Sequence, residues 1–331
     1  MARMGAKAPR VGEANVRTIV IVILLLGAAG AGLWYGTFRA QPLPVDGRLS
    51  FTPPRAAPPE TMRLSVLHAG RMEAWAAMAY RGGALSEVRT FGMDAVLIEH
   101  PAGDLLIDTG FGRDVGAHFE TTPALMQHTS SYIEETPVVD QLRAAGRDPD
   151  ALAGVILTHA HWDHVSGLAD FGDVPVWVTA EEMDFIASDD PGTVLARQLS
   201  PDIQWQVYDF PDGPYLGFPA SRDIHGDGAV VVVPAGGHTP GGVIIFVAPP
   251  RGPRYAFIGD IAWQREGIAM PAERPWLMRD MVDVDAARVR DLLVRLHQMQ
   301  QALPTLIMVP AHDRRVMAQL PPFHAGAATP R

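Results

Sequence analysis

Short apolar runs, separated by polar, glycine-rich or proline-rich turns, fill most of the chain from residue 62 onward. Short runs rich in β-branched residues predict strands, and apolar positions three or four residues apart predict helices. The predicted strands are 63–68, 92–99, 105–107, 153–157, 174–179, 229–234, 243–247, 255–258 and 305–309, and the predicted helices are 138–145, 180–187 and 286–302. Because strands and helices alternate along the chain, the pattern predicts an α/β architecture.

A longer apolar run, residues 19–35, precedes this region and contains no charged residue. Such a run predicts a transmembrane helix, and Trp34 and Tyr35 stand where interfacial aromatic residues are common. The basic residues before it place the N-terminus in the cytoplasm, and they are Arg3, Lys7, Arg10 and Arg17. A cleaved signal peptide is the alternative. In both cases the rest of the chain is expected on the exported side of the cytoplasmic membrane, either anchored or secreted.

The same pattern divides the chain into five parts. We expect a basic cytoplasmic N-terminus at 1–17, the anchor or signal segment at 18–36, a proline-rich linker at 37–61, a folded domain at 62–320 and a flexible tail at 321–331. Proline-rich segments favour extended backbone, so the linker is predicted to be an extended tether.

Composition narrows the possible partners and metal ligands. The formal net charge of the 331-residue chain is -10, which argues against a nucleic-acid partner because phosphate binding requires a basic surface. The chain has no cysteine, so it contains neither a disulfide nor a thiolate ligand. Any metal must therefore be held by imidazole and carboxylate groups.

The predicted strand 153–157 leads directly into the heptapeptide Thr-His-Ala-His-Trp-Asp-His at residues 158–164. Its four potential metal ligands are His159, His161, Asp163 and His164. On a helix, His159 and His161 would point about 200° apart and could not share an ion. On a loop both side chains can turn inward, while Asp163 and His164 diverge toward a second position.

Three further potential ligands follow other predicted strands. His238 lies in a glycine-rich turn with room for an ion beside the backbone, Asp260 follows strand 255–258, and His312 follows strand 305–309. Because strand ends converge on one edge of an open α/β sheet, these residues are expected to meet the heptapeptide. Asp108, which ends strand 105–107, either forms a turn or steadies a metal-bound histidine.

Seven ligands without sulfur are enough for two ions, each with a position left for water. We expect two Zn²⁺ ions, although other divalent metals are possible with these ligands. His159, His161 and His238 are assigned to one ion, and Asp163, His164 and His312 to the other. Asp260 is placed between them, because a carboxylate that bridges two cations is stabilised by both charges.

The heptapeptide, the Gly-His-Thr-Pro-Gly turn around His238, Asp260 and His312 resemble the metallo-β-lactamase superfamily over most of residues 62–320. The resemblance implies a four-layer αβ/βα sandwich with a dinuclear site at the edge of its two sheets. Residues 99–101, 107–110 and 226–228 and the spacing from His238 to Asp260 are most similar to the N-acyl-homoserine lactonase branch. Those lactonases carry a tyrosine three residues after the bridging aspartate to polarise the lactone carbonyl, whereas this chain has Trp263 there.

The expected chemistry is hydrolysis by a hydroxide formed between two metal ions, which attacks an ester, lactone or related carbonyl. Asp163 is expected to hold an ion and also to accept or relay a proton. The substrate is expected to be a small acyl or lactone-type molecule such as an N-acyl-homoserine lactone, and segments 112–135 and 264–281 are predicted to wall its pocket. A thioesterase resembling glyoxalase II and a β-lactamase are alternative enzymes. A membrane-tethered, non-catalytic metal-binding module is the alternative outside enzymes.

Overall fold

The structure is a computed structural model that describes residues 11–324, with side chains described from Thr18 onward. Two mixed sheets pack face to face. The first has the order β4-β1-β2-β3-β5-β6-β7, with β1 (Arg63–Trp75), β2 (Val88–Glu99), β3 (Leu105–Ile107), β4 (Tyr132–Glu134), β5 (Gly154–Ile156), β6 (Val176–Thr179) and β7 (Trp205–Tyr208). The second has the order β12-β11-β10-β9-β8, with β8 (Arg222–Asp223), β9 (Val230–Pro234), β10 (Val243–Val247), β11 (Arg254–Phe257) and β12 (Leu306–Val309).

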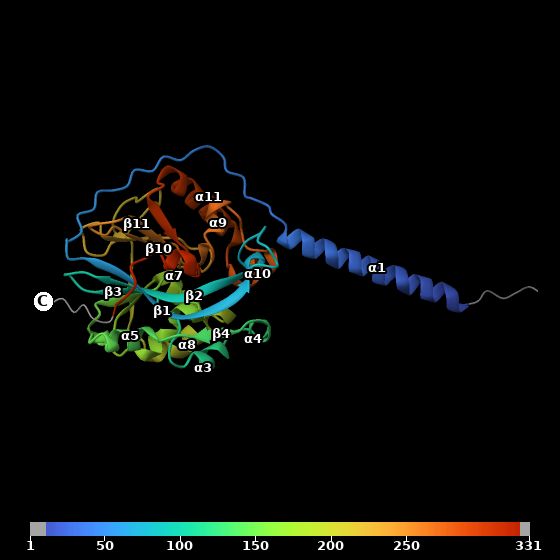
Figure 1. The fold of residues 1–331 in the computed structure, drawn as a ribbon, viewed down its shortest axis with the longest axis horizontal. Coiled ribbons are helices and arrows are strands. Elements are labelled where there is room, and N and C mark those ends of the chain that lie inside the picture. The colour runs from blue at the N-terminus through green and yellow to red at the C-terminus, as the bar shows by residue number, and fades with distance from the viewer. Residues whose placement is uncertain (1–10, 325–331) are drawn as a thin grey trace, which may run out of the picture.

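Helices cover the outer face of each sheet (Figure 1). The helices of the domain are α2 (Ala76–Ala79), α3 (Val115–Phe119), α4 (Ala124–Thr129), α5 (Val138–Ala144), α6 (Trp162–Val165), α7 (Ala180–Ile186), α8 (Val194–Leu199), α9 (Glu266–Ala269), α10 (Trp276–Val282), α11 (Ala286–Ala302) and α12 (Arg314–Met317). Helices α9 and α11 lie above the second sheet in Figure 1, and α3, α5 and α8 lie below the first. The α/β sandwich implied by the sequence is therefore confirmed.

The apolar side chains of a strand point alternately to the two faces of its sheet and so pack against two different layers. In β10, Val243, Ile245 and Val247 belong to the apolar cluster between the two sheets. Ile244 and Phe246 point the other way, into the cluster shared with α11. Successive side chains of a strand face opposite sides, so an apolar strand can serve both interfaces at once. A third cluster joins the first sheet to the helices on its outer face.

Several elements differ from the predictions. Helix α11 has the predicted bounds, whereas β1 and β2 are longer than expected because their antiparallel pairing continues to Trp75 and Val88. Helix α8 and strands β7 and β8 were not predicted. The heptapeptide was expected to be a loop, and this is wrong for its second half: Trp162–Val165 forms a helical turn, since Trp162 and Val165 are both buried against the first sheet.

The N-terminal helix α1 (Val11–Phe38) has 28 residues and projects away from the domain (Figure 1). Its segment Thr18–Phe38 is long and apolar enough to cross a membrane, a criterion that a signal sequence also meets. The last turn of α1 packs directly on the domain. Arg81 donates to the carbonyl of Gly36 at 2.7 Å, Gly82 donates its N–H to the carbonyl of Phe38 at 2.9 Å, and the Phe38 side chain is buried.

The proline-rich segment after α1 is extended and lies along the domain surface. Gln298 donates to the carbonyl of Asp46, Arg254 donates to the carbonyl of Pro54, and Ala57 donates to the carbonyl of Asp227. Proline removes amide donors from this segment, so its carbonyls accept hydrogen bonds from side chains of the second sheet and α11.

Candidate metal centre

The predicted ligands gather at one edge of the sandwich because the strands that carry them run in the same direction. Strands β3 and β5 are parallel, and they end at Asp108 and at the heptapeptide. In the second sheet, β11 is parallel to β12, and β9 runs the same way because β10 is antiparallel to both β9 and β11. His238, Asp260 and His312 follow these three strands. The topology therefore brings residues from distant parts of the chain to one place.

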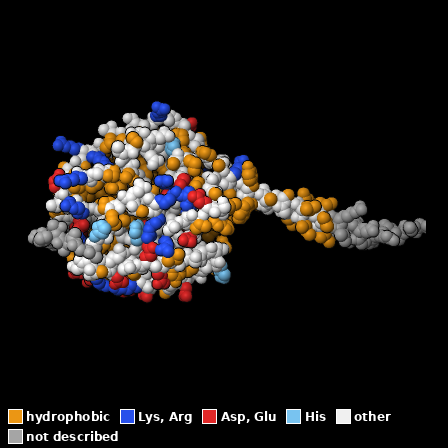
Figure 2. Space-filling view, in the orientation of Figure 1, with side chains coloured by type: hydrophobic (Ala, Val, Ile, Leu, Met, Phe, Trp, Pro, Cys, Tyr) orange, Lys and Arg blue, Asp and Glu red, His pale blue; other side chains and the backbone are white. Residues whose placement is uncertain are grey.

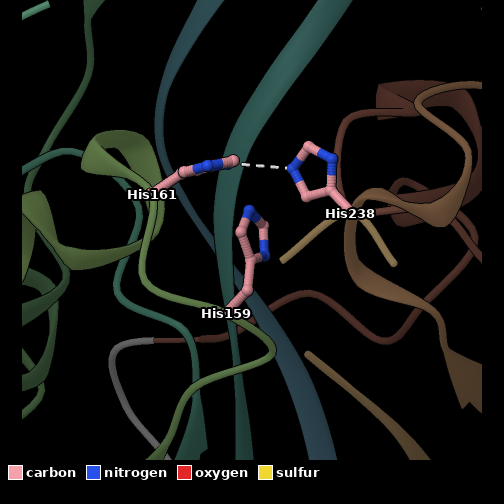
Figure 3. Close-up of side chains that lie close together, drawn as sticks. All are labelled: His159, His161 and His238. Carbon is pink, nitrogen blue, oxygen red and sulfur yellow. Dashed lines mark hydrogen bonds between the residues drawn. The ribbon is translucent and has the colours of Figure 1, made fainter. Parts of the chain in front are cut away.

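His159, His161 and His238 form one group of potential ligands (Figure 3). Each offers one ring nitrogen, and the three atoms lie within 4.8 Å of one another. Nδ1 of His161 and Nε2 of His238 are 2.9 Å apart, and the two rings are perpendicular. His159 and His161 lie on the non-helical part of the heptapeptide, which lets both rings turn toward His238.

Asp163, His164 and His312 form a second group with the same 4.8 Å limit. Asp260 stands between the groups. Its Oδ1 lies 3.0 Å from Nε2 of His312 and 3.5 Å from Nε2 of His164, and its Oδ2 lies 3.5 Å from Nε2 of His238. The structure thus brings all seven predicted residues together, and a third set within the same 4.8 Å limit, His159, His164 and Asp260, joins the two groups.

Three of the histidines are held by acceptors on Nδ1, which leaves Nε2 directed inward. His238 donates Nδ1–H to Asp283 at 2.8 Å, and His164 donates Nδ1–H to Asp108 at 2.9 Å. His312 donates Nδ1–H to the carbonyl of Gly92 at 2.8 Å. An acceptor on Nδ1 selects the tautomer with a lone pair on Nε2, the form that binds a metal.

Asp108 is the residue whose role the sequence left open. Its carboxylate accepts hydrogen bonds from the backbone N–H of Thr158 at 2.7 Å and the Thr158 hydroxyl at 2.8 Å, besides Nδ1–H of His164. Its φ is 52°, in the left-handed region that aspartate enters more readily than most residues. Asp108 therefore ends the strand and orients His164.

Burial and neighbouring charge set the protonation of the histidines in opposite directions. Burial, together with neighbouring imidazoles, lowers the pKa of His159 and His161 well below the usual value. Burial also acts against the His164 imidazolium, but Asp108 and Asp163 outweigh it and raise the pKa of His164. Asp260 likewise raises the pKa of His312 despite its burial. His159 and His161 therefore favour the neutral imidazole, and the second group combines imidazole with negative charge.

Glu182 on α7 is a site residue that the sequence did not reveal. Its buried carboxylate accepts hydrogen bonds from the N–H of Ala160 at 2.6 Å, the Thr239 hydroxyl at 2.8 Å and the N–H of Gly241 at 3.0 Å. It therefore joins the loop of His159 and His161 to the loop of His238. Burial raises the pKa of Glu182 to about 7. The only sequence signal was Thr179-x-x-Glu182, a typical helix start, and Thr179 does cap α7.

Arg274 and Asp283 were also missed: Arg274 lies in segment 264–281, which was predicted only as a pocket wall, and Asp283 lies just after that segment. Arg274 is buried, donates to both carboxylate oxygens of Asp283 and to the backbone carbonyl of Asp260, and stacks over the ring of Trp263. Asp283 and Arg274 therefore support His238 and Asp260 from outside the ligand set. Whether segment 264–281 walls a pocket stays a prediction.

The glycines around His238 have a different role from the one expected. A Cβ at Gly241 would lie 2.2 Å from both the Glu182 nitrogen and the Thr179 hydroxyl oxygen. A Cβ at Gly236 would lie 2.2 Å from the carbonyl oxygen of Pro240. These glycines allow close packing of the turn and α7 rather than leaving room for an ion beside the backbone.

The side chains fit a metal centre on structural grounds alone. Nε2 of His159 and Nε2 of His164 are buried and make no hydrogen bond within the described residues, and Oδ1 of Asp260 makes none of good geometry although it lies 3.0 Å from Nε2 of His312. A buried polar atom without a partner is costly unless something binds it. Here three such atoms converge between the two groups, and all offer the nitrogen and oxygen donors that zinc accepts.

Comparison with known families supplies the decisive observation: the metallo-beta-lactamase superfamily model matches residues 89–312, from β2 to the last predicted ligand. The chain belongs to the metallo-β-lactamase superfamily. It is 29% identical over 243 residues to a probable metallo-hydrolase of Mycobacterium tuberculosis, with 66% of this chain and 73% of that protein covered. It is 26% identical over 167 residues to an N-acyl homoserine lactonase of Agrobacterium fabrum, with 47% of this chain and 59% of that protein covered. The chain is accordingly a metal-dependent hydrolase of this superfamily.

Solved structures of the superfamily share the fold. An N-acyl homoserine lactone hydrolase, with its product N-hexanoyl-L-homoserine bound at the catalytic metal center, aligns with a TM-score of 0.62 at 16% identity, over 79% of this chain and 97% of that one. A dizinc quorum-quenching lactonase, also with a product bound, aligns with a TM-score of 0.50 at 15% identity, over 80% of this chain and 90% of that one. At these identities the likeness concerns the fold.

Proposed function

We propose that this metallo-β-lactamase-superfamily hydrolase holds two zinc ions and hydrolyses an ester-type carbonyl, with N-acyl-homoserine lactones as the first candidate substrates. One observation carries the proposal: Asp260 lies between two ligand groups and directs one oxygen toward each. A single ion would not require ligands on both sides of this carboxylate. Bound in these positions, two cations would supply Lewis acidity, acidify a water and stabilise negative charge that develops on a carbonyl oxygen.

The residues of the centre are assigned separate roles in metal binding and proton transfer. His159, His161 and His238 would hold one ion, and Asp163, His164 and His312 the other. Asp163 is the most accessible carboxylate of the set, with a side chain 12% exposed, compared with 5% for Asp260. It is therefore the group best placed to take a proton from an incoming water or to return one to the leaving group.

Trp263 supports keeping a thioesterase as the second candidate. Its indole N–H donates to Oδ2 of Asp260 at 2.6 Å, and its ring contacts both Phe91 and Arg274. The indole N–H is thus committed to a ligand and is not free to polarise a substrate carbonyl. The lactonase branch resembled in the sequence uses a tyrosine for that purpose, so another substrate class deserves equal testing.

We also propose that α1 anchors the enzyme in the cytoplasmic membrane, with the domain on the exported side. The apolar segment Thr18–Phe38 has 21 residues, and its part up to Tyr35, before the residues that bond to the domain, would be about 27 Å long, close to the thickness of the hydrocarbon core. The mass of the mature protein isolated from membranes would test this. A full-length mass supports an anchor, and loss of the first 27–32 residues would show a cleaved signal peptide.

The central experiment uses the full chain in detergent. Metal content is measured first, and turnover is then measured on acyl-homoserine lactones, acyl thioesters and β-lactams. We expect about two zinc ions per chain and turnover of the lactones. Metal without turnover on any substrate would favour the non-catalytic binding module, and one ion per chain would refute the dinuclear assignment.

A further inference from the structure

The end of α1 and the domain are not separated by a flexible joint. Trp34 and Tyr35 are exposed at the last turns of α1, where an interfacial aromatic belt would lie, and the buried Phe38 follows one turn later. The carbonyls of Gly36 and Phe38 are already bonded to Arg81 and Gly82 of the domain. If α1 spans a bilayer, the domain surface around these bonds must lie at the level of the lipid headgroups.

That surface carries exposed apolar side chains from several elements. Arg81 also bonds to Glu273, which ties the tip of the β1–β2 hairpin to the segment preceding α10. In Figure 1, the hairpin tip, α4 and α10 all lie at the end of the domain from which α1 leaves. The exposed large apolar residues of these elements, here called the anchor-side face, are Trp75, Leu85, Val88, Leu125, Leu277 and Met281.

Two of these apolar residues face each other across the hairpin but are not buried by the rest of the domain. Trp75 and Val88 are cross-strand partners at the end of the hairpin, and both are exposed, at 46% and 59%. Figure 2 shows hydrophobic side chains on the part of the domain next to α1. Arg39, which follows α1 directly, is exposed and could reach lipid phosphates.

From these observations we infer that the anchor-side face rests on the lipid bilayer beside α1, so that the domain is docked on the membrane and not held away from it. This inference depends on the proposed anchoring by α1 but not on the substrate. Helix α10 joins the face to the metal centre, because Leu277 and Met281 are exposed on this helix and Asp283 at its end holds His238. A docked enzyme would therefore meet acyl-chain substrates that partition into the membrane.

The absence of cysteine makes a direct test possible. Single cysteines at Leu25, Val88, Leu277 and Val207 can each carry a nitroxide label in the full chain. Val207 is the matched control for Val88, because it is also an exposed valine (53%) but lies on β7, the far edge strand of the first sheet. The protein is reconstituted into vesicles of phosphatidylethanolamine and phosphatidylglycerol, and label collisions with dissolved oxygen and a water-soluble nickel chelate are compared.

Docking predicts that labels at Val88 and Leu277 collide with the nickel chelate several-fold less often than the label at Val207. The label at Leu25 reports on the anchor separately. If the label at Leu25 were protected from the nickel chelate while the labels at Val88 and Leu277 were fully accessible to it, the docking proposal would be refuted and the anchor proposal would stand. Nickel access at Leu25 would overturn both. Neither outcome depends on hydrolysis.

A second variant tests whether the apolar character of the face causes the docking. Leu277→Glu combined with Met281→Glu places two charges on exposed positions, where folding should tolerate them. We expect the label at Val88 to become as accessible to nickel as the label at Val207, with Leu25 still protected. Unchanged protection at Val88 in this variant would contradict docking through this face.

Discussion

Glu182 accepts a hydrogen bond of 2.6 Å from the backbone N–H of Ala160, the residue between His159 and His161. The same carboxylate holds Thr239 and Gly241, which follow His238. One side chain therefore sets the distance between the two loops that would supply the first ion, although it is not itself placed as a ligand.

Glu182→Ala should weaken zinc binding and reduce kcat/KM by about 10–100-fold, the usual effect of losing a group that orients metal ligands. The substitution leaves the N–H groups of Ala160 and Gly241 without their acceptor. Glu181→Ala, on the exposed side of the same helix, is the control and should change neither quantity. Zinc titration and steady-state kinetics measure both. If the Glu182→Ala variant bound zinc as tightly as the wild type, Glu182 would not be needed to position the metal ligands.

His161→Ala and Asp163→Asn should each abolish turnover while the domain stays folded. His161→Ala removes one ligand of the first group, so the metal content is expected to fall from about two ions per chain toward one. Asp163→Asn keeps the shape but loses the negative charge and the proton acceptor. Circular dichroism, metal analysis and activity are compared with His128→Ala, an exposed histidine outside the centre. Full activity in either variant would contradict the site assignment.

Trp263→Tyr tests what this position does. A phenol can polarise a substrate carbonyl, and one oxyanion donor is worth up to about 10²–10³-fold in rate, so we expect lactone turnover to rise by about tenfold relative to thioester turnover. Trp263→Phe is the matched control, since it removes the hydrogen bond to Asp260 without adding a hydroxyl. A parallel change in both substrates with both variants would show that Trp263 acts only through Asp260.

His118 provides a pH-dependent contribution to stability outside the ligand set. Its ring is buried, its Nδ1 lies 2.8 Å from the Ser166 hydroxyl oxygen, and burial lowers its pKa below the usual 6.5. Below pH 6.5 the unfolded chain therefore binds a proton that the folded chain does not. The free energy of unfolding therefore decreases as the pH falls from 6.5 toward the lowered pKa of His118, by no more than about 1.4 kcal/mol per pH unit.

His118→Gln should remove that dependence. The free energy of unfolding of the wild type, minus that of the variant, is expected to decrease between pH 6.5 and 5 and to be constant above pH 7.5. Urea unfolding at a series of pH values measures it, with the exposed His128→Gln as the control. A difference that does not vary with pH would mean that the His118 pKa is not lowered by folding.

The local sequence was sufficient for the α/β class and for naming candidate ligand residues. Apolar runs that alternate with amphipathic segments predicted an α/β architecture, because strand and helix periods depend on neighbouring residues, whereas the two-sheet sandwich was implied only by the family resemblance. The heptapeptide and the single ligands after three other strands could be found because sheet topology places the ends of parallel strands together. For Asp108 the sequence left two roles open, a turn former or a support for a metal-bound histidine, and the structure shows both, because Asp108 ends β3 and accepts a hydrogen bond from His164.

Only the tertiary structure revealed the residues that hold these ligands in place. Glu182 meets Ala160 across 22 positions and Asp283 meets His238 across 45. Neither the glutamate within α7 nor the aspartate that follows α10 has sequence neighbours that would predict such a contact. The same holds for α1: its composition predicted a membrane segment, but the bonds from Arg81 and Gly82 to its last turn join residues more than 40 positions apart. Local patterns determine elements, whereas long-range hydrogen bonds and packing determine how the elements and their ligands are held.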